Sequence, residues 1–203
     1  FLLSLYSFRM FKKTYHWMLR HAEGPKATAA LGAVAFIESS VFPLPPDLML
    51  IPMGLARREK AFFYALVATV ASVLGGMLGY AIGFFFYETV GQWILNLYGG
   101  AQEWYGHFSE FFQKYGGWVI LRKGLTPFPF KVLTILSGMT RLDLGVFIVS
   151  SIVARAGRFF LVAGLIYVYG DKIRGFLEKH LDAALLGFLL LAVAGFLAVK
   201  FLF

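Results

Sequence analysis

The sequence predicts an all-α integral membrane protein: an inverted repeat in which each unit is a re-entrant helical hairpin followed by one transmembrane helix. Three observations support this fold class. Of 203 residues, 59% are apolar and only 15% are charged, against roughly 25% charged in soluble domains. Prolines interrupt two of the apolar segments, and a shift of the sequence by 84 positions places one of these segments on the other. We expect a single membrane domain over residues 1–203.

Composition also excludes several function classes. The chain has no cysteine, which rules out disulfides, thiolate metal sites and cysteine nucleophiles. Its net charge of +8 would suggest nucleic-acid binding in a soluble protein, but the basic residues cluster beside apolar runs. Anionic lipid head groups and membrane topology explain such clusters better, so we expect no nucleic-acid partner.

The first unit follows an interfacial segment. Residues 1–26 mix apolar, aromatic and basic residues without an uncharged run long enough to cross a bilayer, which predicts an N-terminal amphipathic helix. Residues 27–87 form repeat 1. Prolines in its first half remove backbone donors and prevent a continuous helix, so this half predicts a re-entrant hairpin whose backbone is covered by protein or water. The loop prolines are Pro43, Pro45 and Pro46.

The second half of repeat 1 is the clearest transmembrane helix. Residues 61–87 contain no Asp, Glu, Lys or Arg, and these 27 residues, at 1.5 Å rise each, exceed the roughly 30 Å hydrocarbon core. Gly75, Gly79 and Gly83 recur every four residues. A stripe of small residues lets another helix approach closely, and simple helix packing is the plainest interpretation of this one.

The rest of the chain repeats this order. Residues 88–114 carry the aromatic residues typical of the head-group region, which predicts an interfacial connector. Residues 115–170 form repeat 2, a second re-entrant hairpin followed by a transmembrane helix. We expect a charged loop over residues 171–182 and a C-terminal transmembrane helix over residues 183–203. The loop prolines of the second hairpin are Pro127 and Pro129.

The offset of 84 positions relates the two units, because it places Pro43 on Pro127 within a local cluster of identities. A hairpin returns to the side from which it enters, so each unit crosses the membrane once and the two units must have opposite orientations. Transporters with inverted repeats bind substrate where broken segments meet near the midplane. We therefore expect residues 38–47 and 122–131 to approach each other.

The same offset aligns acidic with basic residues, Glu38 with Arg122 and Asp47 with Lys131. If the hairpins face each other, these charges can pair. An unpaired charge at the bilayer centre costs at least about 2.5–3.5 kcal/mol, so such residues need a partner, water or a function. Two plainer alternatives remain open: Glu38 and Arg122 extend to the interface, and Asp47 and Lys131 cap the hairpins.

Two further arginines interrupt the second transmembrane helix near its middle, and their spacing of three places them on one helical face. A lipid phosphate requires desolvated cations, and the planar guanidinium binds two phosphate oxygens at once. Carboxylates in a poorly hydrated site can take up and release protons. The candidate substrate-binding residues are Arg122, Lys131, Arg155 and Arg158, and the candidate proton-coupling residues are Glu38 and Asp47.

The distribution of basic residues predicts the orientation. Lys and Arg accumulate in residues 1–26, 57–60 and 172–179, which this topology places on one side, while residues 88–114 on the opposite side carry three Glu and one Lys. Cytoplasmic segments are enriched in Lys and Arg. We therefore expect the N-terminus to be cytoplasmic.

Four stretches together resemble the DedA family, also called SNARE-associated or VTT-domain proteins, and in particular its YqaA-like branch. The likeness covers roughly residues 28–172. The resemblance implies a transporter or scramblase that depends on the proton motive force. It also implies an acidic pair around the first proline loop and a basic pair around the second, which by position are Glu38 with Asp47 and Arg122 with Lys131. The stretches are Glu38 before FPLPPD (residues 42–47), GGMLGYAIG (75–83), LRKGLTPFPFKVLTILSG (121–138) and RAGRFFLVAGLIYVYG (155–170).

The function expected from residues and resemblance together is lipid transport. A flippase or scramblase would move a phosphate-bearing lipid, such as undecaprenyl phosphate or a phospholipid, across the bacterial cytoplasmic (inner) membrane, with protons as the coupling ion. The sequence lacks H-E-x-x-H, G-x-S-x-G and P-loop motifs, so we expect neither an enzyme nor a metal or other cofactor. The alternatives are a proton- or cation-coupled exchanger of a small solute and a non-transporting membrane scaffold.

Overall fold

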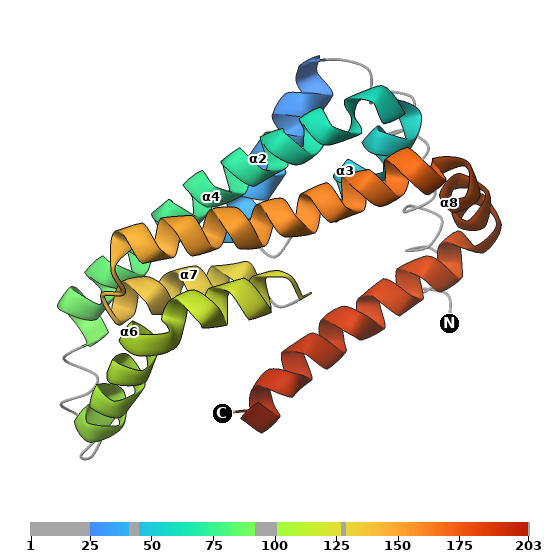
Figure 1. Cartoon of the computed structure of the whole chain (residues 1–203). Coiled ribbons are helices and arrows are strands. Elements are labelled where there is room, and N and C mark those ends of the chain that lie inside the picture. The colour runs from blue at the N-terminus through green and yellow to red at the C-terminus, as the bar shows by residue number, and fades with distance from the viewer. Residues whose placement is uncertain (1–24, 41–44, 92–100, 127–128, 203) are drawn as a thin grey trace.

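The computed structural model describes residues 25–40, 45–91, 101–126 and 129–202, and all regular structure in these ranges is helical (Figure 1). The predicted all-α class is confirmed for this part of the chain. The amphipathic helix predicted for residues 1–26 lies outside the described residues, apart from its last two positions, which belong to the first described helix.

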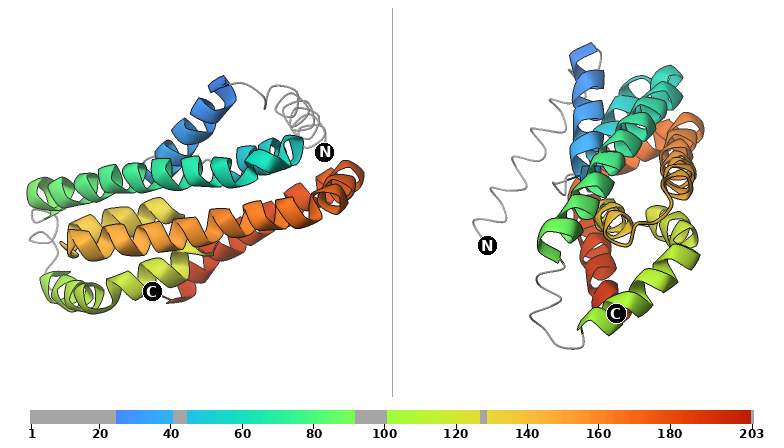
Figure 2. Two further views of the ribbon diagram at one scale, coloured as in Figure 1. Left: turned by 45° about the horizontal axis from the view of Figure 1, so that its top comes forward. Right: turned by 90° about the vertical axis from the view of Figure 1, so that its left-hand side faces the viewer.

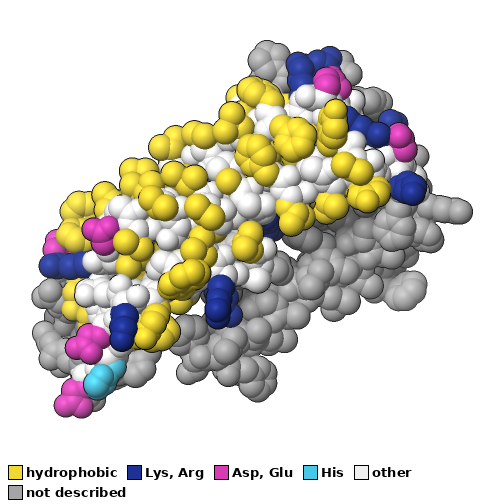
Figure 3. Space-filling view, in the orientation of Figure 1, with side chains coloured by type: hydrophobic (Ala, Val, Ile, Leu, Met, Phe, Trp, Pro, Cys, Tyr) yellow, Lys and Arg dark blue, Asp and Glu magenta, His cyan; other side chains and the backbone are white. Residues whose placement is uncertain are grey.

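Two long helices form the body of the molecule. Helix α4 (Ala61–Phe86) and helix α8 (Leu144–Leu202) lie side by side and antiparallel over the length of α4 (Figure 2). The helical stretches Arg58–Thr89 and Leu144–Gly175 are long and apolar enough to cross a membrane. Hydrophobic side chains cover the middle of the face drawn in Figure 3, and charged side chains gather mainly at its two ends. This distribution is that of an integral membrane protein.

The first proline segment separates two shorter helices, α2 (Pro25–Ser40) and α3 (Asp47–Ala56), and the short turn η1 (Arg58–Lys60) follows them. The predicted interruption of the helix is therefore present. Pro45 and Pro46 lack the N–H that a continuing helix would need, and α3 begins immediately after them.

The second proline segment separates α6 (Ala101–Gly124) from α7 (Phe130–Met139). Pro129 has an extended backbone (φ −61°, ψ 107°), so α7 begins only after it. The boundary predicted between a connector ending at residue 114 and a hairpin starting at residue 115 is wrong, because α6 runs through it. Gly116 and Gly117 do not end this helix, and Leu142 packs against Gly116 while Val146 of α8 packs against Gly117.

One further boundary differs from the prediction. Helix α8 continues from Leu144 to Leu202, through residues 171–182, where the charges suggested a loop and a separate helix after it. Lys, Arg, Glu and Leu are good helix formers, so a charged segment of this composition need not interrupt a helix. Figure 1 shows that α8 instead changes direction in its brown part and that its red part runs back along the molecule.

The half-helices pack crosswise on the two long helices. Helices α2 and α7, from different broken segments, both pack on α4, while α3 and α6 both pack on α8. Two hydrophobic clusters result. One joins α2, α3 and α4 to Phe159, Ala163 and Ile166 of α8, and the other joins α6 and α7 to Phe147 and Ala154 of α8. The boundary between the clusters falls on α8 between residues 154 and 159.

The glycine stripe of α4 allows both α2 and α7 to approach its backbone, as predicted. A Cβ atom at Gly75 would overlap the carbonyl oxygen of Phe36 in α2, and one at Gly83 would overlap the carbonyl oxygen of Ile135 in α7. Gly79, between them, faces Thr134 of α7. The stripe therefore fixes the distance between α4 and both broken segments.

Replacing Gly83 with alanine is expected to destabilise the protein by about 1–3 kcal/mol, because the new methyl group must displace backbone rather than a flexible side chain. Gly164→Ala is the matched control, since a Cβ there meets no atom within 4 Å and alanine favours the helix by about 0.5–1 kcal/mol. Thermal unfolding in detergent micelles measures both. A Gly83→Ala protein as stable as Gly164→Ala would contradict this account of the stripe.

Candidate functional site

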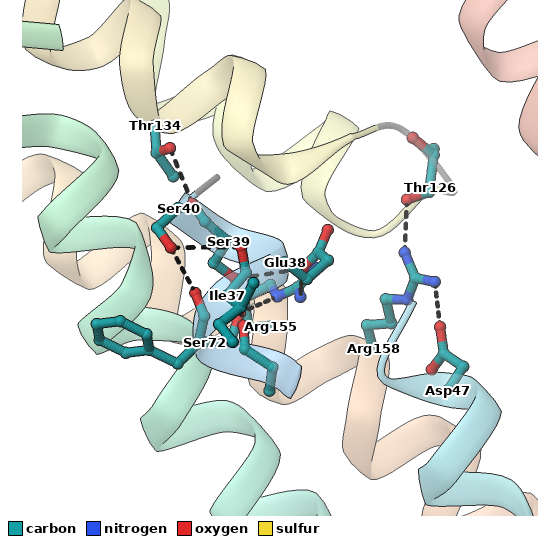
Figure 4. A network of polar contacts seen from close by, with 12 residues as sticks. Ile37, Glu38, Ser39, Ser40, Asp47, Ser72, Thr126, Thr134, Arg155 and Arg158 are labelled. Carbon is teal, nitrogen blue, oxygen red and sulfur yellow. Dashed lines mark hydrogen bonds and ion pairs between the residues drawn. The ribbon is translucent and has the colours of Figure 1, made fainter. Parts of the chain in front are cut away.

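Two arginines of α8 lie at the boundary between the hydrophobic clusters. Arg155 and Arg158 are three residues apart and therefore on one helical face, and both reach toward the ends of the shorter helices (Figure 4). The apolar surroundings would make unpaired charges costly here. Each arginine accordingly pairs with a carboxylate from the first broken segment, Glu38 with Arg155 and Asp47 with Arg158.

The Arg155 side chain is almost fully buried, with 1% of the residue exposed. Its Nη2 donates to Glu38 Oε2 at 2.5 Å, and its Nε donates to Ser72 Oγ of α4 at 2.5 Å. The guanidinium carbon lies 4.7 Å from the centre of the Phe130 ring and 4.8 Å from that of Phe159. Charge, hydrogen bonds and aromatic faces thus satisfy the guanidinium from several sides.

Hydroxyl groups extend this arrangement to α7. Ser39 Oγ lies 2.6 Å from Ser72 Oγ and donates to Glu38 Oε2 at 3.2 Å. Thr134 Oγ1 of α7 donates to the carbonyl oxygen of Ser39 at 3.2 Å. The end of α2 is therefore connected by hydrogen bonds to α4, α7 and α8 at one point, which is where both broken segments meet (Figure 4).

Arg158 makes a second connection between the two broken segments. Its Nη2 pairs with Asp47 Oδ2 at the start of α3, and its Nη1 donates to the carbonyl oxygen of Thr126 at 2.9 Å, just beyond α6. The Arg158 side chain is 17% exposed, whereas Arg155 is 2% exposed by the same measure. Asp47 Oδ1 is buried without a hydrogen-bond partner. Arg158 thus bridges Asp47 of the first broken segment and Thr126 of the second.

The pairing expected from the sequence offset is corrected. The ion partner of Glu38 is Arg155 rather than Arg122, and that of Asp47 is Arg158. Arg122 is exposed in the last turn of α6, on the same outer face as Tyr115 and Trp118, because residues three and four apart share a helix face. Lys131 is half-buried in the first turn of α7.

Sequence analysis missed the groups that hold Arg155 in place. Ser72 is one of the few hydroxyl residues in a span without charged residues, three residues before Gly75 and therefore on the glycine face of α4. That position was a usable signal. No comparable signal marked Phe130, whose ring contacts Arg155 only through the tertiary fold, or Thr126, which contributes a backbone carbonyl.

The described residues hold no group of three or more His, Cys, Asp or Glu side chains that could bind a metal ion. The site therefore consists of two arginines, two carboxylates and the neighbouring hydroxyls. An arrangement of this kind can exchange one anion for another at an arginine, and it can exchange a proton at a carboxylate.

Comparison with known proteins identifies the family. The family model of the VTT domain matches residues 44–168, which is more than half of the chain. The chain belongs to the VTT-domain family. These are the DedA or SNARE-associated membrane proteins. The match begins within the first broken helix junction and contains the second one. Asp47, Arg155 and Arg158 lie inside the matched range, whereas Glu38 lies just before it.

Two relatives resemble almost the whole chain. An "Uncharacterized protein" of Haemophilus influenzae is 35% identical over 194 residues, covering 94% of this chain and 96% of the relative. A homologous "Uncharacterized protein" of Histophilus somni is 31% identical over 191 residues, covering 94% and 97%. No solved structure matches the chain significantly. The VTT-domain match therefore covers the site except for Glu38, and the relatives extend the similarity to 94% of the chain.

Proposed function

We propose that this VTT-domain protein is a lipid transporter, a flippase or scramblase that moves a lipid with a phosphate head group across the bilayer, with proton coupling. One observation carries the proposal: two arginine–carboxylate pairs, Glu38–Arg155 and Asp47–Arg158, lie where two interrupted helices meet inside an apolar bundle. Ionisable groups at such depth mark substrate and proton pathways in membrane proteins.

The dimensions of the short helices support re-entrant hairpins. Helices α3 and α7 have 10 residues each, so each is about 15 Å long and spans only half of the roughly 30 Å hydrocarbon core. The crosswise packing of α3 on α8 and α7 on α4 supports the inverted repeat, since each broken segment uses both long helices in the same way. In our proposal each interrupted segment enters and leaves the membrane on the same side. The two segments do so from opposite sides of the membrane.

The different exposure of the two arginines suggests different roles. Arg155 is enclosed by Glu38, Ser72 and two aromatic rings, so it holds the broken segments together. Arg158 is partly exposed and has one carboxylate partner, so an entering phosphate can compete with Asp47 for its guanidinium. We therefore assign head-group binding first to Arg158, with exposed Arg122 and half-buried Lys131 as the other basic residues near the second break.

Proton coupling follows from the same competition. In the structure, Asp47 is paired with Arg158. When a lipid phosphate takes that arginine, the carboxylate loses its partner in a buried site, and proton uptake becomes favourable. Lipid release on the other side restores the pair and favours proton release. Asp47 and Glu38 remain our proposed proton-coupling residues.

The membrane and the orientation are part of the proposal. Lys and Arg at the η1 end of the bundle, around residues 57–60 and 172–174, contrast with Glu88, Glu103 and Glu110 at the other end. The enrichment of basic residues on cytoplasmic segments favours a cytoplasmic η1 end, with the N-terminus on that side. We place the protein in the bacterial cytoplasmic (inner) membrane.

The deciding experiment is reconstitution of the purified protein into vesicles that contain a fluorescent phosphate-bearing lipid in one leaflet. We expect the lipid to redistribute between leaflets faster than in protein-free vesicles and to respond to an imposed pH gradient. Unchanged redistribution together with proton-coupled uptake of a small solute would favour the exchanger. Release of the lipid phosphate would instead indicate an enzyme.

Arg158 substitutions test the head-group site. Arg158→Lys keeps the charge but loses the planar fork, so lipid flux should fall about tenfold, and Arg158→Ala should fall further, as expected when 1.4 kcal/mol or more of binding is lost. Lys114→Ala is the control, because it removes an exposed charge on α6. Equal flux for all three variants would remove Arg158 from the site.

A further inference from the structure

Each long helix is preceded by an arginine, and an acidic residue lies at the far end of its apolar part. Arg58 lies three residues before α4 begins at Ala61, and Arg141 lies three residues before α8 begins at Leu144. Asp171 comes directly after the predicted span of α8, and Glu88 lies just beyond α4. Because α4 and α8 are antiparallel, the arginine before one helix meets the acid at the far end of the apolar part of the other.

These residues form two ion pairs at opposite ends of the α4–α8 pair. Arg58 pairs with Asp171 at one end, and Arg141 pairs with Glu88 at the other. We infer that the two ion pairs are the gates of the protein, which open one at a time to expose the central site to opposite faces of the membrane. They are called the Arg58 gate and the Arg141 gate below.

The Arg58 gate has a surface shaped to receive it. Asp171 is preceded by Gly170, and a Cβ atom at Gly170 would overlap the guanidinium group of Arg58. The absence of a side chain at this position of α8 therefore lets Arg58 lie against the helix and reach Asp171. The contact joins η1 to α8, two elements that are far apart in the sequence.

The Arg141 gate has a different support. Arg141 Nη2 donates to Glu88 Oε1 at 2.7 Å, and its guanidinium carbon lies 5.3 Å from the centre of the Phe84 ring. The backbone φ of Arg141 is 52°, a left-handed conformation that disfavours side chains other than those of Gly, Asn and Asp. Arg141 thus carries its side chain at a position where a glycine would be less strained.

Burial separates the gates from the central network. The gate side chains are substantially exposed, from 30% for Arg58 to 90% for Asp171, and exposed ion pairs stabilise only weakly. The Glu38–Arg155 pair is buried and held by further hydrogen bonds. Opening at either end therefore costs little, while the centre about which the two long helices would move stays intact.

The internal repeat relates the two gates. The offset of 84 positions places Arg57 on Arg141 and Glu88 on Lys172, so each gate falls within one residue of its counterpart. An ion pair between an arginine and an acidic residue therefore occurs at equivalent positions in both units. A repeat of opposite orientation would place one gate on each membrane face, which is the arrangement that alternating access needs.

The test uses a buried cysteine as a reporter of opening. The chain has no cysteine, and Ser151 is fully buried in α8, one helical turn before Arg155, with an unpartnered hydroxyl, so Ser151→Cys adds one buried thiol close to the central site. The protein is reconstituted in vesicles with one insertion direction. A membrane-impermeant maleimide is then supplied either outside or inside, and the rate of labelling is measured.

With both gates intact, we expect slow labelling from either side. Arg58→Ala should raise the rate about two- to fivefold from the side of Arg58 only, and Arg141→Ala should do so from the opposite side only, as follows from losing a weak exposed pair. The charge exchange Arg58→Asp with Asp171→Arg should restore the slow rate. Lys114→Ala, which removes a charge outside both gates, should have no effect.

Two outcomes overturn the inference: unchanged labelling in both gate variants, or faster labelling from the same side in both. Glu88→Gln and Asp171→Asn break the same pairs from the acidic partner and leave the backbone at Arg141 untouched, so they decide the question if Arg141→Ala fails to fold. Labelling reports opening whether or not lipid is moved. A protein with alternating labelling and no lipid flux would retain the gates and lose the proposed transport function.

Discussion

Replacing Arg155 with methionine is expected to destabilise the protein by about 3–5 kcal/mol, because it leaves the Glu38 carboxylate buried without its cation. The same change removes the hydrogen bond to Ser72 and the contacts with Phe130 and Phe159. Equilibrium unfolding in detergent micelles measures the loss. Arg122→Met is the matched control, since Arg122 is exposed on α6 and surface substitutions usually change stability by less than about 0.5 kcal/mol.

A second variant separates a buried ion pair from a general packing effect. In Glu38→Leu with Arg155→Met both charges are absent, so much of the lost stability should return, as it does when buried ion pairs are replaced by apolar residues. If the double variant is as unstable as the sum of the two single variants, Glu38 and Arg155 do not interact energetically. A fully stable Arg155→Met protein would show that the Arg155 network does not hold the broken segments together.

Local sequence features predicted the elements of this fold well. Proline chemistry identified both helix breaks, and an uncharged run identified α4 to within one residue of its end. The glycine spacing predicted the close packing on α4. These features are determined by residues that are close together in the sequence, where steric clashes and missing hydrogen-bond donors have strong effects. The predicted end of the helix at residue 170 was wrong, because charged residues alone do not interrupt a helix, and α8 continues to Leu202.

The partners of the buried charges could not be obtained in the same way. The offset aligned Glu38 with Arg122, but aligned positions in a repeat are equivalent rather than adjacent, and they touch only if they lie near the axis that relates the units. Glu38 lies in the last turn of α2 inside the bundle, whereas Arg122 lies on the outer face of α6. The arginines of α8 were recognised as costly charges at mid-span, yet their pairing depends on where the tertiary fold places the end of α2 and the start of α3.

The largest functional effect is expected for Asp47→Asn. Asparagine keeps the shape of the side chain and a carbonyl oxygen that can accept from Arg158, but it cannot take up a proton at neutral pH. In reconstituted vesicles, lipid redistribution should continue while its response to an imposed pH gradient disappears. Glu110→Gln is the matched control, because it removes an exposed carboxylate from α6 and should leave the response intact.

Glu38→Gln distinguishes the two buried carboxylates. Glu38 is enclosed with Arg155 and accepts from Ser39, so removing its charge should lower stability by leaving Arg155 unpaired and should weaken the pH response less than Asp47→Asn does. Asp47 has the partly exposed arginine and an unpartnered oxygen, which is what a group that exchanges its partner with an incoming phosphate requires. If the Asp47→Asn protein redistributes lipid with an unchanged response to the gradient, Asp47 is not the coupling group, and if Glu38→Gln is also unchanged, transport is passive and the arginine–carboxylate pairs serve to hold the broken helices in place.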